Sequence, residues 1–199
     1  MIKKALMGLA TQQAYAFIRE SYQRSIKYTT ASQTAEALGK PLLVVGGPWG
    51  GSQWRRFAKF PAHGCGDVCL DMDSRSCEGC NFQEGDIRDM PFQDKEFGAA
   101  FCSHVLEHMH TGEDCAHAWW ELNRVADTVF VCLPGKDTIS GWMAPDHHLW
   151  VSNLGSGVLK IQERKGRGRF IIGDTPSAGF ISGGGGTVEE PDIIVNPGY

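Results

Sequence analysis

The stretch that decides the fold of this chain is Leu42-Leu43-Val44-Val45-Gly46-Gly47-Pro48-Trp49-Gly50-Gly51. Its four consecutive apolar residues predict a strand that is covered on both faces, as in a parallel sheet. The glycines that follow let the backbone turn sharply and approach a ligand without side-chain obstruction. A strand that ends in such a turn is typical of a pocket for a nucleotide-type cofactor.

The same pattern continues along the chain with two acidic residues. A second apolar run, residues 68–70, ends on Asp71, and Asp86 precedes a third run at residues 97–102. An acid about twenty residues after a glycine turn can accept hydrogen bonds from ribose hydroxyls. This spacing predicts that Asp71 lies at the end of the second strand and faces the ligand.

The order of these segments resembles the class I S-adenosylmethionine-dependent methyltransferases, in particular the small type 11-like group. The residues that carry the resemblance are Gly85-Asp86, Pro91-Phe92 and His104-Val105-Leu106-Glu107-His108, within residues 41–150. It implies a compact α/β fold with a Rossmann-like, mostly parallel sheet and helices on both faces. Residues 158–162 and 169–172 predict, in addition, a terminal antiparallel hairpin.

The resemblance also implies where S-adenosylmethionine would bind. The implied cofactor-binding residues are Gly46, Gly47, Gly50, Asp71, Met72, Asp86, Ile87 and Ser103. The glycine turn would frame the methionine end and supply backbone amides for its carboxylate, since amides at a helix N-terminus favour anions. Asp71 would bind the ribose and Asp86 the adenine. His104 is the candidate catalytic residue, as a general base near the methyl acceptor or as part of the pocket floor.

Two positions depart from the family pattern. Val44 stands where the family usually has an acid, and Pro48 stands where it usually has a glycine. Proline removes an N–H donor and fixes φ, so the loop differs from the standard one. The predicted function is methyl transfer to an unidentified acceptor. The alternative is a non-catalytic subunit that retains the fold as part of a larger assembly, because fold alone does not determine function.

The cysteines leave a second alternative open. His63 and the cysteines at 65, 69, 77 and 80 could hold a tetrahedral zinc ion. Cys69 lies within an apolar run, however, where a thiol usually packs as a small hydrophobe, and we predict no metal. An odd number of cysteines without a signal peptide favours reduced thiols and a cytoplasmic location.

Composition divides the chain into three parts. We expect an amphipathic helix and linker over residues 1–38, with the helix ending near residue 28, a methyltransferase core over 39–173 and an extended, glycine-rich acidic tail over 174–199. The tail or the basic N-terminal helix could contact a protein partner, and the tail could also be held by the basic hairpin. A net charge of −4 argues against binding to nucleic acid, and no apolar run is long enough for a transmembrane segment.

Overall fold

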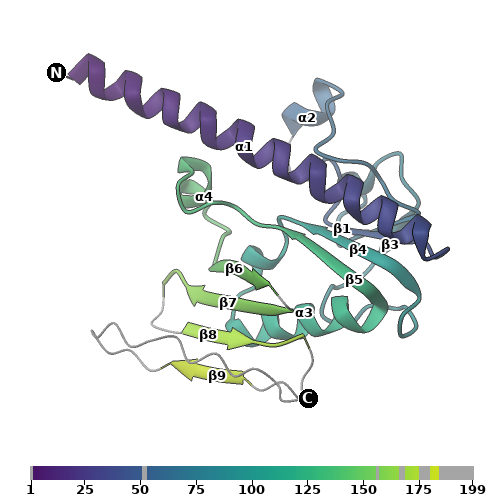
Figure 1. Ribbon diagram of the computed structural model, residues 1–199. Coiled ribbons are helices and arrows are strands. Elements are labelled where there is room, and N and C mark those ends of the chain that lie inside the picture. Colours follow the sequence, from purple (N-terminus) through teal and green to yellow (C-terminus); the bar gives the residue numbers. More distant parts are fainter. Residues whose placement is uncertain (1, 51–52, 156, 166–168, 175–179, 184–199) are drawn as a thin grey trace.

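The computed structural model describes residues 2–50, 53–155, 157–165, 169–174 and 180–183 (Figure 1). The helices are α1 (Ile2–Ala37), α2 (Gln53–Phe57), α3 (Gly112–Val125) and α4 (Ile139–Met143), and two 3₁₀ turns are η1 (Ser74–Cys77) and η2 (Leu106–His108). The strands are β1 (Leu42–Val45), β2 (Val68–Asp71), β3 (Phe82–Glu84), β4 (Phe97–Ser103), β5 (Ala126–Cys132), β6 (Leu149–Gly155), β7 (Val158–Glu163), β8 (Arg169–Ile172) and β9 (Phe180–Gly183).

The core of the molecule is a five-stranded parallel sheet with the order β3-β2-β1-β4-β5. In the register, Val44 pairs with Cys69 on one side and with Phe101 on the other. All residues of β1 and β4 are buried, as expected for strands covered on both faces. The predicted Rossmann-like fold class is therefore confirmed, and its ligand-binding crevice is expected beyond the carboxyl ends of β1 and β4.

Helices α1 and α3 cover opposite faces of this sheet. Trp119 and Leu122 of α3 are buried against one face, whereas Ala31 and Ala35 of α1 are buried against the other. The prediction that the N-terminal helix ends near residue 28 is wrong, because small alanines let α1 continue closely packed on the sheet to Ala37. Figure 1 shows that the N-terminal part of α1 extends well past the sheet.

A second, antiparallel sheet has the strand order β6-β7-β8-β9. The pairing of β7 with β8 confirms the predicted hairpin. The sequence reading missed β6 and β9, which extend the hairpin on both sides. Strand β9 falls within the predicted tail and pairs with β8, which belongs to the basic hairpin; residues 175–179 and 184–199 of that tail lie outside the described residues.

The expectation of reduced thiols is wrong for four of the seven cysteines. Disulfides join Cys65 to Cys80 and Cys69 to Cys77. The cause is local, since β2 and the turn from η1 to β3 fold back on each other and bring the pairs together. These bonds also occupy the four sulfur atoms that the zinc alternative required. The three free cysteines, Cys102, Cys115 and Cys132, are buried.

Candidate active site

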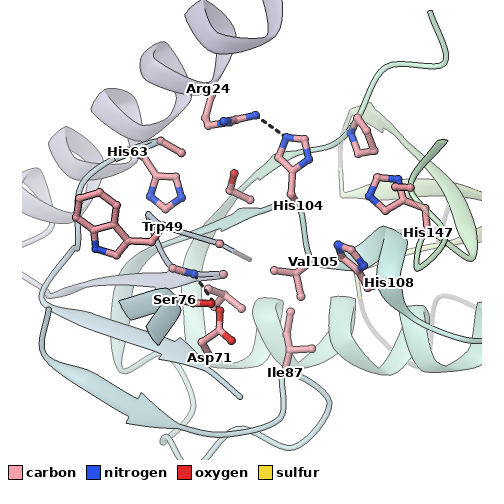
Figure 2. Close-up of a pocket in the computed structure, with 18 of the residues that line it drawn as sticks. Arg24, Trp49, His63, Asp71, Ser76, Ile87, His104, Val105, His108 and His147 are labelled. Carbon is pink, nitrogen blue, oxygen red and sulfur yellow. Dashed lines mark hydrogen bonds between the residues drawn. The ribbon is translucent and has the colours of Figure 1, made fainter. Parts of the chain in front are cut away.

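A cavity of about 800 Å³ opens at the carboxyl ends of β1, β2 and β4 (Figure 2). This volume lies within the range of small-molecule sites. The cavity lining includes all nine residues predicted from the sequence: Gly46, Gly47, Gly50, Asp71, Met72, Asp86, Ile87, Ser103 and His104. Residues separated by almost sixty positions in the sequence thus share one wall.

The glycine turn after β1 is tightly built. A Cβ atom on Gly47 would lie 2.0 Å from the Ser76 carbonyl oxygen, so only glycine fits there. The turn's amides are already used within the protein: Gly46 N–H donates to the Leu70 carbonyl, and Gly50 N–H donates to the Gly47 carbonyl. The expected donation of these amides to a ligand carboxylate is therefore not seen in the geometry of the turn.

Asp71 connects the ends of β1 and β2. Its Oδ2 accepts a hydrogen bond from Gly47 N–H at 3.1 Å, and its Oδ1 accepts from Asp73 N–H at 2.9 Å. Each carboxylate oxygen can accept two hydrogen bonds, so each keeps capacity for a ligand hydroxyl. Asp71 can therefore fix the turn and still bind a ribose. The neighbouring Met72 side chain is largely exposed at the cavity edge.

Asp86 is more fully engaged than Asp71. Its two oxygens contact the Arg88 guanidinium at 2.6–3.1 Å, and Oδ1 also accepts from Arg88 N–H at 2.9 Å. The side-chain hydrogen bond from Arg88 lowers the pKa of Asp86. Arg88 also pairs with Asp114 on α3. Little acceptor capacity is left on Asp86 for an adenine amino group unless the Arg88 side chain moves.

His104 follows β4 with a φ of 56°, an unusual conformation for a residue other than glycine. Its Nε2 lies 2.7 Å from Arg24 Nη2 and 3.0 Å from Glu20 Oε1. Its Nδ1 lies 3.1 Å from Glu107 Oε1. Glu20 and Arg24 belong to α1, so the N-terminal helix forms part of the site. Strained backbone of this kind is commonly retained at functional positions.

Two opposing effects act on the pKa of His104. Burial favours the neutral ring, but contacts with Glu107 and Glu20 outweigh burial and raise the pKa to about 9. The Arg24 guanidinium can only donate, so its 2.7 Å contact to Nε2 fits the neutral ring, whereas Glu20 fits the protonated one. We assign the protonated ring near neutral pH, because two carboxylates surround it against one guanidinium.

His63 also lines the cavity, but its pKa is shifted in the opposite direction from that of His104. Burial lowers the pKa of His63 to about 4, and its ring packs edge-on against Phe101 and stacks with Tyr28. The nearby Arg24 is buried, and its Nε has no hydrogen-bond partner within the described part of the chain. An anionic group of a ligand would satisfy this donor.

The far end of the cavity is rich in histidine. His108 and His147 line it, and their rings meet edge to face with centroids 4.8 Å apart (Figure 2). Glu107 lies behind them, completely buried, and its backbone carbonyl accepts from His148 N–H at 2.8 Å. From the sequence, Glu107 and His108 were expected only to cap and orient the following turn, with no role in the site. It could not place His147 beside them, because nearly forty residues separate the two segments.

Comparison with known proteins supports the family resemblance. Residues 59–128 match the model of a family described as "Methyltransferase domain". The resemblance to class I S-adenosylmethionine-dependent methyltransferases is therefore confirmed over this part of the chain, which contains Asp71, Asp86, Ser103 and His104. No curated protein matches the chain.

Solved methyltransferase structures also align with this chain. A possible histamine N-methyltransferase from Thermotoga maritima is 14% identical, with 60% of this chain and 56% of that chain covered and a TM-score of 0.30. A complex of a methyltransferase with the Trm112 methyltransferase activator of Haloferax volcanii is 17% identical, with 58% of this chain and 55% of that chain covered and a TM-score of 0.32. An amino pentose methyltransferase from Micromonospora echinaspora is 17% identical, with 86% of this chain and 72% of that chain covered and a TM-score of 0.36. The chain spans little more than half the length of the first two.

Among the described residues, no helix combines the length and apolar character needed to cross a membrane.

Proposed function

We propose that this chain binds S-adenosylmethionine in the cavity at the ends of β1, β2 and β4 and transfers its methyl group to an acceptor. The observation that carries the proposal is the gathering of all nine residues predicted from the sequence on the lining of one cavity. The bound sulfonium would supply the methyl group. Transfer to a nucleophile depends mainly on alignment and exclusion of water, so the protein's task is positioning.

The residues present fit this cofactor in two ways. Asp71 retains acceptor capacity for ribose hydroxyls, since each of its oxygens accepts only one hydrogen bond from the chain. Arg24 offers a buried Nε donor that a carboxylate could satisfy, whereas the glycine-turn amides are occupied. We therefore assign the methionine carboxylate to Arg24 in place of the amides of Gly46 and Gly47.

In this proposal, the methyl acceptor binds beside His104, and His104 and α1 close that part of the cavity. Ser103 and His104 follow β4 directly, and Glu20 and Arg24 of α1 contact the His104 ring. A ring with a pKa of about 9 holds its proton at neutral pH. His104 would then be a cation held between Glu20 and Glu107 beside the acceptor, and would act as a base only after losing that proton.

A non-catalytic subunit with this fold is the second candidate. It is favoured by the engagement of both Asp86 oxygens with Arg88 and by Val44, which is fully buried in β1 where the family has an acid. We also propose that the methyl acceptor and the protein partner are two different molecules, each separate from this chain. A cytoplasmic location was inferred from its composition, but the two disulfides favour an oxidising environment.

Calorimetric titration with S-adenosylmethionine and S-adenosylhomocysteine tests the proposal. We expect micromolar binding, a loss of about tenfold or more in Asp71→Ala, and unchanged binding in Asp73→Ala. Asp73 is a matched control because it lies two residues away and pairs with Arg75 outside the cavity lining. Failure of the folded wild-type protein to bind either ligand would favour the non-catalytic candidate.

A further inference from the structure

Glu107 has a buried carboxylate that lacks hydrogen bonds from the described residues. The residue is completely buried, and neither carboxylate oxygen has a hydrogen-bond partner in the described part of the chain. The 3.1 Å approach of His104 Nδ1 to Oε1 is an ion-pair contact without hydrogen-bond geometry. The protonated His104 ring offsets part of the charge at Oε1, but a buried carboxylate that accepts no hydrogen bond from the described residues still costs free energy.

His147 directs a ring nitrogen toward the same place. Its Nδ1 lies 3.3 Å from the Gly141 carbonyl oxygen, which can only accept, so Nδ1 carries the proton. Nε2 then carries a lone pair, and it lies 4.0 Å from Glu107 Oε1. Two electron-rich atoms thus face each other. An imidazole that donates one N–H to a carbonyl and turns the other nitrogen inward is the usual arrangement of a metal ligand.

His108 completes a group of three. One ligand atom from each of Glu107, His108 and His147 lies within 4.8 Å of the other two. Donors bound about 2.0–2.2 Å from one ion can lie up to about 4.4 Å apart, so small side-chain movements close the site. Asp146 adds an oxygen 3.3 Å from His108 Nδ1. The bond from His148 N–H to the Glu107 carbonyl fixes η2 against the segment before β6.

We propose that Glu107, His108 and His147 bind a divalent transition-metal ion, most specifically zinc. Two imidazoles and one carboxylate form a ligand set that suits zinc and its neighbours, whereas magnesium and calcium prefer oxygen ligands. This site is distinct from the cysteine cluster, and no metal was expected from the sequence. Three protein ligands leave coordination positions open, and His108 and His147 line the cavity.

The location of this metal site at the histidine end of the cavity indicates a class of methyl acceptor. This part of the inference rests on the proposed function. An ion at the histidine end would hold a small molecule through a hydroxyl or carboxylate oxygen. Metal coordination lowers the pKa of a bound hydroxyl and so favours its nucleophilic form. Metal binding itself does not depend on the cofactor, and we therefore test it without S-adenosylmethionine. Failure of the site and failure of the proposed function can then be told apart.

The test is a titration of the chelator-treated, untagged full chain with Co²⁺, followed by its visible absorption and by competition with Zn²⁺. We expect one ion per chain, displaced by Zn²⁺, and a loss of about 100-fold in affinity in Glu107→Gln and His147→Ala. His117→Ala is the matched control, because His117 lies on α3 outside the cavity lining, and it should bind normally.

Several results would overturn the proposal. They are the absence of binding to folded wild-type protein, equal binding by His147→Ala and His117→Ala, and tighter binding of Mg²⁺ than of Zn²⁺. If Glu107→Gln does not fold, His108→Ala gives the same information, because the His108 side chain is partly exposed and tolerates truncation more readily.

Discussion

The two ends of the cavity satisfy their charged groups in different ways. At the glycine-turn end, the backbone amides of Gly47 and Asp73 hold Asp71, and the Arg88 side chain holds Asp86. At the histidine end, the buried Glu107 carboxylate accepts no hydrogen bond from the described residues, and it lies close to His147 from a distant segment. Donors within the protein thus fix the carboxylates of the first end, whereas the Glu107 carboxylate at the second end has an ion-pair contact with His104 and can accept a further cation.

The largest expected effect concerns the glycine turn. Gly47→Ala should lower the free energy of unfolding by about 3 kcal/mol or more, because its Cβ would overlap the Ser76 carbonyl and the backbone must move. Gly50→Ala is the control: its φ is 52°, but no atom lies within 4 Å of the added Cβ, so about 1 kcal/mol is expected. Urea unfolding of both variants measures the difference. Equal losses would show that the turn is not tightly built.

The disulfides should support the same end of the cavity. Cys69–Cys77 joins β2 to η1, and η1 carries the Ser76 carbonyl that accepts from Trp49 N–H. Reduction should lower the unfolding free energy by about 2–4 kcal/mol. Thiol counting on unfolded protein should find three thiols per chain before reduction and seven after it. Seven thiols without reductant would contradict both bonds.

The histidine end predicts a pH dependence with a definite sign. The pKa of His104 is raised from 6.5 to about 9, so its stabilising contribution is complete below about pH 6.5 and is lost as pH rises through about 9. The loss should reach at most about 3 kcal/mol in chelator-treated protein. Glu20→Gln should reduce the pH dependence, and His104→Gln should remove it. An equally steep profile in His104→Gln would place its origin elsewhere.

His63 should show the opposite dependence with a smaller magnitude. Burial lowers its pKa from 6.5 to about 4, so the unfolded chain binds the proton first and stability falls as pH decreases from about 6.5 to 4. We expect about 2 kcal/mol, since the ring is only partly buried. His63→Phe keeps an aromatic ring against Phe101 and should flatten the unfolding profile in this range. Carboxyl groups that titrate between about pH 6.5 and 4 are the same in both proteins, so the difference between the two profiles reports on His63.

The contrast between the two ends also explains what the sequence could predict. Gly46 and Gly47 follow β1 and Asp71 ends β2, so their positions at the sheet edge could be inferred from the order of apolar runs. The same reasoning predicted the hairpin of β7 and β8. These features depend on local pattern and on the order of strands. Asp86 was placed by the family motif, because β3, the strand before it, was not predicted.

The remaining features depend on contacts between distant segments. Arg24 and Glu20 reach His104 only because α1 continues as one helix along the sheet. His147 reaches Glu107 only because β6, which was not predicted, brings its preceding loop to η2. The disulfides depend on a shorter-range contact, the pairing of β2 with β3, which was not predicted either. Apolar periodicity contains no information on such side-chain encounters.

The most direct test of the account is an NMR titration of ¹⁵N-labelled protein with S-adenosylhomocysteine. We predict that the amide signals of Gly46, Asp71, Ile87 and Ser103 shift together and saturate, while those of β7 do not move. Such a result would place the cofactor in the cavity at the ends of β1, β2 and β4. The absence of shifts, or shifts confined to the antiparallel sheet, would contradict the claim that this cavity is a methyltransferase site.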